Sequence, residues 1–122
     1  MSHLIICLGK ENQEKLYNII SHFDNVYIIS EHDYTIDVNL IKPEQKVSLL
    51  LVPSLDLKNL SIALFNELKS QLAKDKITDL DIAINIYFGS GKIHMATISA
   101  VIKLGYGIRF VDVDEKGNIL EL

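Results

Sequence analysis

The sequence contains one cysteine, one arginine and no long apolar run. A lone cysteine cannot support an intrachain disulfide framework, so we expect a protein of the reducing cytoplasm, with Cys7 as a small buried core residue. No apolar run reaches the length of a membrane span. The N-terminal stretch also lacks the basic region of a secretory signal peptide. We therefore expect neither export nor a membrane partner.

Positive charge is scarce as well. The net charge is −4, and Arg109 is the only arginine. Proteins that bind a nucleic-acid duplex usually carry a basic face that neutralises many phosphates. We therefore expect no duplex partner, and any nucleic-acid ligand would be small and held locally.

Apolar patterning predicts a single domain over residues 1–122, which is long enough to bury a core. Short apolar runs between turn residues predict strands, and apolar residues at helical spacing predict helices. Strands are predicted at residues 4–8, 26–29, 47–52, 82–88, 106–113 and 118–122, and helices at 16–23, 57–74 and 93–104. This alternation predicts a Rossmann-like three-layer α/β/α fold with a mostly parallel sheet and a C-terminal antiparallel edge hairpin.

Two segments before the middle of the chain carry more specific expectations. In residues 31–45, Ile36, Val38 and Leu40 alternate with polar residues, which suggests a half-buried edge strand, although a loop also fits. The continuous apolar run at residues 47–52 predicts a strand that is covered on both faces.

The helix predicted at residues 57–74 has a regular apolar side. Either Ser54 or Asp56, in the turn before this helix, is a suitable N-cap. Its predicted inner residues are Leu57, Leu60, Leu64, Leu68 and Leu72.

The helix predicted at residues 93–104 is unusually apolar. Between Lys92 and Lys103 it holds one histidine and no charged residue. A helix that is apolar nearly all round is normally buried on more than one side. Because the sheet of so small a domain covers only one side, we expect a second copy of the chain to cover the other, in a two-fold homodimer.

The strongest functional signal lies in residues 81–113, which read as a strand, a glycine loop, a helix and a second strand. Gly89-Ser90-Gly91-Lys92 stands where the first strand ends and the helix begins. A helix start offers unpaired N–H groups and a partial positive charge, glycines allow close approach, and a lysine adds a full charge. The segment is therefore suited to hold a phosphate or another anion.

Ligands of open parallel sheets bind at the carboxyl ends of the strands, where the strand order reverses. Loops with suitable chemistry occur at residues 9–12, 53–56 and 89–94. We expect the first strand and the strand at 82–88 to be central neighbours, so that the first and third loops flank the reversal. The candidate ligand-binding residues are Gly9, Lys10, Glu11, Asn12, Ser54, Gly89, Ser90, Gly91, Lys92 and Ile93.

Two common phosphate-binding motifs are absent. A P-loop needs a glycine where Ile86 stands and a serine or threonine where Ile93 stands. The dinucleotide fingerprint needs a third glycine where His94 stands. We therefore expect neither a magnesium-dependent nucleoside triphosphatase nor a dinucleotide cofactor, and the sequence offers no cluster of metal ligands near the glycine loop.

The order of elements along nearly the whole chain, together with Phe88-Gly89-Ser90-Gly91-Lys92, resembles the CARF domains. These are the Rossmann-like sensors of cyclic oligoadenylate in type III CRISPR defence. Their late strand typically ends in a T-G-G-T-K-like segment that opens a helix rich in small apolar residues. A further strand and an edge hairpin then follow in that family, as we predict here.

The resemblance implies a homodimer that binds one cyclic oligoadenylate across its two-fold axis. We expect no fused effector in 122 residues, and stand-alone sensors of this kind are often ring nucleases that degrade the signal. That chemistry needs no metal, because a ribose 2′-hydroxyl attacks its own phosphodiester. Lys92 and the N–H groups near Ser90 suit charge stabilisation, and His94 or Lys10 suits proton transfer, so Lys92, Ser90 and His94 are the candidate catalytic residues.

Two alternatives stay open from the sequence. The chain fits a non-catalytic sensor that regulates a separate partner or sequesters the signal. It also fits a Rossmann-like domain that binds another small anion, with the glycine loop serving only as a turn.

Overall fold

The computed structural model describes residues 2–9, 13–79 and 81–122. Within these residues the chain forms β1 (His3–Cys7), α1 (Gln13–Ile20), β2 (Asn25–Ser30), a 3₁₀ turn (Val38–Leu40), β3 (Lys46–Leu51), α2 (Leu57–Lys74), β4 (Asp81–Asn85), α3 (Gly91–Lys103), β5 (Gly107–Val113) and β6 (Ile119–Glu121). No helix in the described part of the chain has both the length and the apolarity of a bilayer span.

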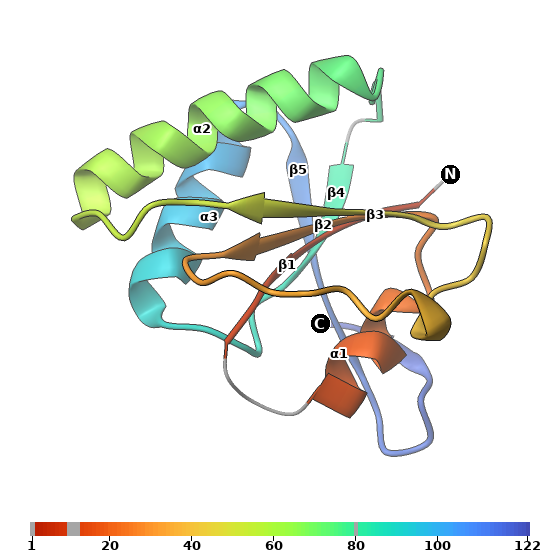
Figure 1. The fold of residues 1–122 in the computed structure, drawn as a ribbon. Coiled ribbons are helices and arrows are strands. Elements are labelled where there is room, and N and C mark those ends of the chain that lie inside the picture. Colours follow the sequence, from red (N-terminus) through yellow and green to blue (C-terminus); the bar gives the residue numbers. More distant parts are fainter. Residues whose placement is uncertain (1, 10–12, 80) are drawn as a thin grey trace.

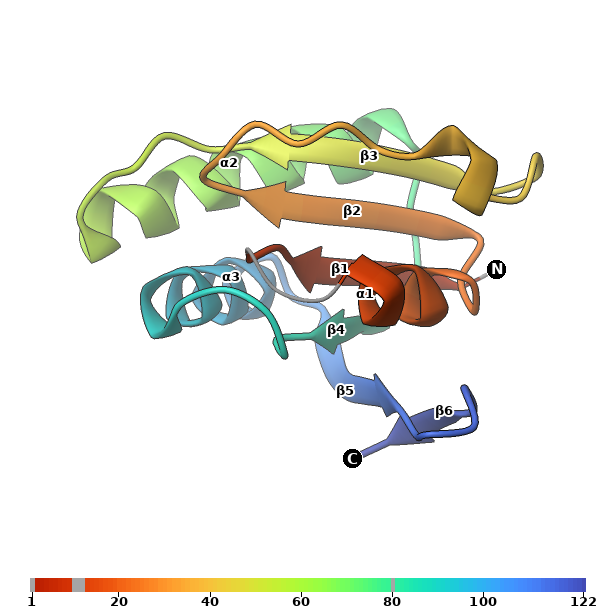
Figure 2. The ribbon, with the colours of Figure 1, turned by 60° about the horizontal axis from the view of Figure 1, so that its bottom comes forward.

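The strands lie in the order β3-β2-β1-β4-β5-β6. Neighbouring strands are parallel, except for the antiparallel pair β5 and β6. Helices α2 and α3 cover one face of the sheet, and α1 covers the other (Figure 1, Figure 2). The predicted three-layer fold with its C-terminal edge hairpin is confirmed. β1 and β4 are neighbours, also as predicted, so the strand order reverses between them.

Strand β1 is the fully buried centre of the sheet. Ile5 and Cys7 belong to the core under α2 and α3, whereas Leu4 and Ile6 belong to the core under α1. Cys7 Sγ lies 3.4 Å from Thr97 Oγ1 on α3. Burial raises the pKa of the Cys7 thiol to about 11, in spite of the opposing effect of the Thr97 hydrogen bond. Cys7 is therefore an unreactive core residue, as predicted.

Helix α2 is capped by Asp56, whose carboxylate accepts the Asn59 N–H at 2.9 Å. Ser54, the other candidate cap, is exposed in the preceding loop. Leu57 was predicted on the inner side, but as the first helical residue it is 37% exposed. The buried leucines of this helix are Leu60, Leu64, Leu68 and Leu72.

The segment between β2 and β3 is a loop, so its prediction as an edge strand is wrong and the loop alternative is correct. It contains the 3₁₀ turn Val38–Leu40, where Val38 is 75% exposed. The Tyr17 hydroxyl on α1 lies 2.5 Å from the Tyr34 hydroxyl and accepts the Asp37 N–H at 2.9 Å. Side-chain anchors to α1, and not strand pairing, therefore hold this segment, and of its alternating apolar residues only Ile36 packs against the core.

Strand β3 lies at the edge of the sheet. Leu50 packs in the core under α2, and Val47 and Leu49 pack on the α1 side. Leu51, however, is 54% exposed. The predicted cover on both faces is thus only partial, because an edge strand has a neighbour on one side alone.

The turn after β4 differs from prediction. The strand ends at Asn85 because the Asn85 side chain bonds across the turn: its Nδ2 donates to the Val111 carbonyl at 2.8 Å, and its Oδ1 accepts the Tyr87 N–H at 3.1 Å. Phe88 is then buried on the α1 side. Helix α3 begins at Gly91, earlier than predicted, because Ser90 caps it.

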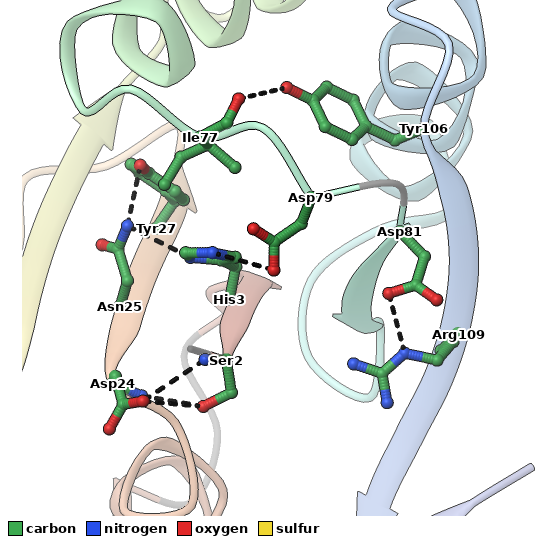
Figure 3. Close-up of polar contacts among 10 residues, drawn as sticks. All are labelled: Ser2, His3, Asp24, Asn25, Tyr27, Ile77, Asp79, Asp81, Tyr106 and Arg109. Carbon is green, nitrogen blue, oxygen red and sulfur yellow. Dashed lines mark hydrogen bonds and ion pairs between the residues drawn. The ribbon is translucent and has the colours of Figure 1, made fainter.

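A network of polar side chains lies at the amino ends of the central strands. Figure 3 shows three of its members, His3, Asn25 and Tyr27. Asn25 Nδ2 lies 3.4 Å from His3 Nδ1 and donates to the Tyr27 hydroxyl at 3.1 Å. The Tyr27 hydroxyl donates to Asp75 at 2.6 Å, and Lys46 forms an ion pair with the same carboxylate. The network therefore joins three strands to the end of α2.

We predict that Asp75→Asn lowers the free energy of unfolding by about 1–2 kcal/mol at neutral pH. Burial opposes the charged form of Asp75, but hydrogen bonds from Lys46 and Tyr27 lower the pKa of this carboxyl below its ordinary 3.8. Such a group stabilises the protein above its ordinary pKa, and that contribution is lost as the pH falls through its folded pKa. In urea denaturation, the difference from wild type should therefore shrink below about pH 4.

Glu44→Gln is the matched control, because it removes a carboxylate at an exposed position. An equal loss of stability in both variants at neutral pH would contradict the role assigned to the Asp75 network.

Candidate functional site

The carboxyl ends of β1, β2 and β4 meet at a cavity of about 330 Å³. The chain leaves β1 toward α1 on one face of the sheet and leaves β4 toward α3 on the other (Figure 2). A crevice therefore opens where the strand order reverses. The cavity is lined by Leu8, Gly9, Glu31, His32, Gly89, Ser90 and Ile93. Gly9, Gly89, Ser90 and Ile93 are among the ligand-binding residues predicted from the sequence.

Gly89 is the tightest point of the glycine loop. Its φ of +92° lies in the left-handed region, and an added Cβ would meet Ile93 Cγ2 at 3.0 Å and the Leu8 carbonyl oxygen at 3.5 Å. Both its conformation and its packing therefore require glycine. Gly91 is the first residue of α3, and an added Cβ there would enter open space.

The N-terminus of α3 faces the cavity through Ser90 and Ile93. The Ser90 hydroxyl accepts the Ile93 N–H at 3.3 Å and thereby caps the helix. The first N–H groups of a helix have no carbonyl partner within it, and the helix dipole adds a partial positive charge. The backbone can therefore bind an anion here, while the Ser90 side chain acts as the cap.

Lys92 holds two loops of this edge together. Its Nζ donates to the Leu55 carbonyl at 2.9 Å and lies 3.3 Å from Glu31 Oε2. The Glu31 side chain is 15% exposed, and that of Lys92 is 37% exposed. The cation predicted to bind an anion is thus already paired with a carboxylate at the cavity.

Glu31 and His32 line the cavity but were missing from the prediction. They stand at the polar start of the segment 31–45, for which the sequence predicted only an edge strand or a loop. A usable signal exists, because Glu31 directly follows a buried strand that ends at the same edge as the glycine loop.

His94 has a local partner. Its Nε2 lies 2.5 Å from the Phe88 carbonyl oxygen, and since a carbonyl only accepts, Nε2 carries the proton. The ring lies on the outer face of α3 and not among the residues that line the cavity. This hydrogen bond fixes the tautomer and orientation of the ring, so any proton transfer by His94 would use Nδ1.

Among the predicted site residues that the structure describes, Ser54, Gly91 and Lys92 do not line the cavity. Ser54 is exposed in the loop before α2 and is not among the lining residues. Lys10, Glu11 and Asn12 lie outside the described residues, so their contacts stay predictions. A search of the described residues found no group of histidine, cysteine, aspartate and glutamate that could hold a metal ion.

The outer face of α3 carries a second hollow, which is apolar and has a volume of about 560 Å³. Met95 and Ile102 are each 60% exposed there. The hollow is lined by Gly91, His94, Met95, Ile98, Ser99, Ile102 and Lys103. The face that the sequence predicts to be covered by a second copy is thus open in a single chain.

Comparison with family models and with curated proteins gave no match. Solved structures share the fold. Csm6 from Enterococcus italicus, bound to cyclic hexa-2′-fluoro-hexa-dAMP, matches with a TM-score of 0.67 at 12% identity, over 93% of this chain and 33% of that chain. Protein VC1899 from Vibrio cholerae matches with a TM-score of 0.67 at 12% identity, over 98% of this chain and 33% of that one. The chain spans about a third of each structure, and its CARF-like fold is confirmed.

We predict contrasting effects of alanine at the two glycines of the loop. Gly89→Ala forces a β-carbon against Ile93 at a positive φ and should lower the free energy of unfolding by about 1–3 kcal/mol. Gly91→Ala adds a methyl group in open space at a helical position, so it should leave stability unchanged or raise it by up to about 1 kcal/mol. Urea denaturation of both variants tests this, and equal destabilisation would contradict the loop geometry.

Proposed function

We propose that this protein binds a cyclic oligoadenylate at the cavity at the carboxyl ends of β1, β2 and β4. The observation that carries the proposal is the position of this cavity. It lies between Gly9 and the N-terminus of α3, at the strand-order reversal, in a fold shared with a Csm6 that was bound to a cyclic oligonucleotide. Backbone N–H groups at a helix start are a general binding site for phosphate oxygens.

The size of the cavity supports a shared ligand. Its volume of about 330 Å³ is at the lower end of the range for small-molecule sites, which is about 300–1,000 Å³. A cyclic oligonucleotide is larger than one such cavity, so each chain would hold part of the ring. We propose that a homodimer formed through the outer face of α3 supplies the second cavity.

The proposed chemistry is that of a ring nuclease of type III CRISPR defence, which degrades the signal. The 2′-hydroxyl gives up its proton as its oxygen bonds to the adjacent phosphorus, the P–O5′ bond breaks, the 5′-oxygen takes up a proton in turn, and a 2′,3′-cyclic phosphate remains. N–H groups of α3 and the Lys92 ammonium would stabilise the charge that develops on the phosphorane. Positioning for in-line attack supplies the rest of the rate enhancement.

A second candidate function is binding without cleavage, as a sensor. It is favoured by the present partners of the three candidate catalytic side chains. Ser90 caps α3, His94 donates to the Phe88 carbonyl, and Lys92 is held by Glu31 and the Leu55 carbonyl. In this arrangement Glu31 neutralises the Lys92 charge, and His94 does not line the cavity.

We predict that incubation with cyclic oligoadenylates of several ring sizes, in EDTA, yields linear products with 2′,3′-cyclic phosphate ends for the preferred ring. Chromatography and mass spectrometry of the products provide the measurement. Binding without cleavage would support the sensor, and absence of binding would favour a site for another small anion. Activity that is lost in EDTA and restored by manganese would overturn the proposed chemistry.

The Lys92→Met variant sharpens the same experiment, and Lys74→Met at the exposed end of α2 is its control for the lost charge. If Lys92 turns to a ligand phosphate, its loss should weaken binding by about 1.5–3 kcal/mol in calorimetry, the usual value of a hydrogen bond to a charged group. Equal affinities of both variants would remove Lys92 from the site.

We also predict that the wild-type protein is a dimer and that Ile102→Glu is a monomer. Ile102 is 60% exposed in a single chain, so a charge there is tolerated by the fold but not inside an apolar interface. Light scattering at micromolar concentration measures the mass. Val38→Glu, at a 75% exposed position on the loop before β3, is the control that should stay dimeric. A monomeric wild type would refute the proposed interface.

A further inference from the structure

Glu31 is an acidic side chain at the wall of an anion-binding cavity. It directly follows β2, whose neighbour is β1, and the Leu8 N–H donates to the Ile29 carbonyl at 2.8 Å. This bond sets the end of β2 beside the end of β1, so Glu31 lines the cavity together with Leu8 and Gly9. Its side chain is 15% exposed, and its Oε2 lies 3.3 Å from Lys92 Nζ.

A carboxylate at this place restricts which part of a ligand can meet it. It accepts hydrogen bonds and repels phosphate. The phosphate of a bound nucleotide therefore fits the N–H groups of α3, on the Ser90 side of the cavity, and a hydrogen-bond donor fits the Glu31 side. Lys92 pairs with Oε2 of this carboxylate, so a ligand without a donor would leave only its remaining lone pairs unfilled, which disfavours such a ligand at a site built for a donor.

The topology indicates which donor this is. In doubly wound sheets with the same strand order, phosphate lies at the N-terminus of the helix after the first strand, and an acidic residue about 20 residues further on, at the end of the second strand, binds a ribose hydroxyl. Here the phosphate is placed instead at α3, on the other side of the reversal, so only the acidic position corresponds. Glu31 stands at the corresponding strand end, across the cavity from the start of α3. The 2′-hydroxyl is the ribose group that RNA carries and DNA lacks, so a protein that binds it distinguishes RNA from DNA.

Resting on the proposed binding of cyclic oligoadenylate, we infer that Glu31 accepts a hydrogen bond from a ribose 2′-hydroxyl of the ring and makes the site select ribonucleotides. The ion pair with Lys92 orients the carboxylate before the ligand arrives. The Leu55 carbonyl holds Lys92 independently at 2.9 Å, so the lysine keeps its position when Glu31 turns to the hydroxyl.

The test compares a cyclic oligoadenylate with its 2′-fluoro analogue, which keeps a polar 2′-substituent but has no proton to donate. Affinities for both rings are measured on ice, over times shorter than any cleavage, with wild type, Glu31→Ala and Glu31→Gln. Glu44→Ala, at an exposed position, is the control for the lost charge. Circular dichroism confirms that each variant is folded. Glu31→Gln keeps an oxygen acceptor and should retain part of the preference, so Glu31→Leu, which has no acceptor, replaces Glu31→Ala if the latter unfolds.

We expect wild type and Glu44→Ala to prefer the ribose ring by roughly tenfold or more, the discrimination that one unpaired polar group gives. In Glu31→Ala this preference should fall to about threefold or less, with affinity for the fluoro ring unchanged or higher because a negative charge is gone. The ratio of the two affinities tests the inference, because loss of the ion pair between Glu31 and Lys92 changes both affinities alike.

Three results would overturn the inference. If the preference in Glu31→Ala equals that of wild type, Glu31 does not meet the 2′-hydroxyl. If only the preference against a cyclic oligoinosinate changes, Glu31 meets the adenine amino group instead. If wild type binds neither ring, the inference fails together with the proposed function, which distinguishes that failure from one confined to Glu31.

Discussion

The position of β1 between β2 and β4 is the constraint on which the rest of the structure depends. Crossovers between parallel strands are right-handed, so connections that run in opposite directions along the sheet place their helices on opposite faces. The chain moves from β1 to β2 on one side and from β4 to β5 on the other. Helix α1 and helix α3 are consequently separated by the sheet, and the cavity lies between the loops that lead to them.

Among the described residues, the charges of Lys92 and Glu31 at this cavity cancel. Lys92 is paired with Glu31 and held by the Leu55 carbonyl, so its ammonium does not present an isolated positive charge. Recognition of an anion then depends chiefly on N–H groups that the capped helix start holds in fixed directions. This agrees with a chain whose net charge is −4, because a protein that attracts nucleic acid by field alone needs an excess of basic residues. An oriented site of this kind favours a small ligand with defined geometry over a long nucleic acid.

The sequence predicts well what repeats regularly. The leucines of α2 recur with helical spacing, and the alternation of strands and helices limits the sheet to a few topologies, so the β1–β4 neighbourhood and the edge hairpin were predictable. The loop at 31–45 was not. Val38 and Leu40 of its alternation are exposed, and the segment is anchored by contacts to the distant Tyr17 hydroxyl. Glu31 was missed for the same reason, since its importance depends on the distant Lys92. Likewise, the hydrogen bond between His94 and the Phe88 carbonyl depends on the turn at Phe88, which the apolar spacing of the sequence does not indicate.

The first turn of α3 belongs to two surfaces at once. Ser90 and Ile93 line the cavity, whereas Gly91 and His94 begin the apolar hollow on the outer face of the helix. Successive residues of a helix point about 100° apart, so one turn can serve a ligand and a partner without a connecting segment. In the proposed dimer, a copy seated on the hollow therefore brings a second cavity beside the first. A ring that occupies both cavities binds the dimer and not the single chain, and by linkage it strengthens the interface by as much as dimerisation strengthens its own binding.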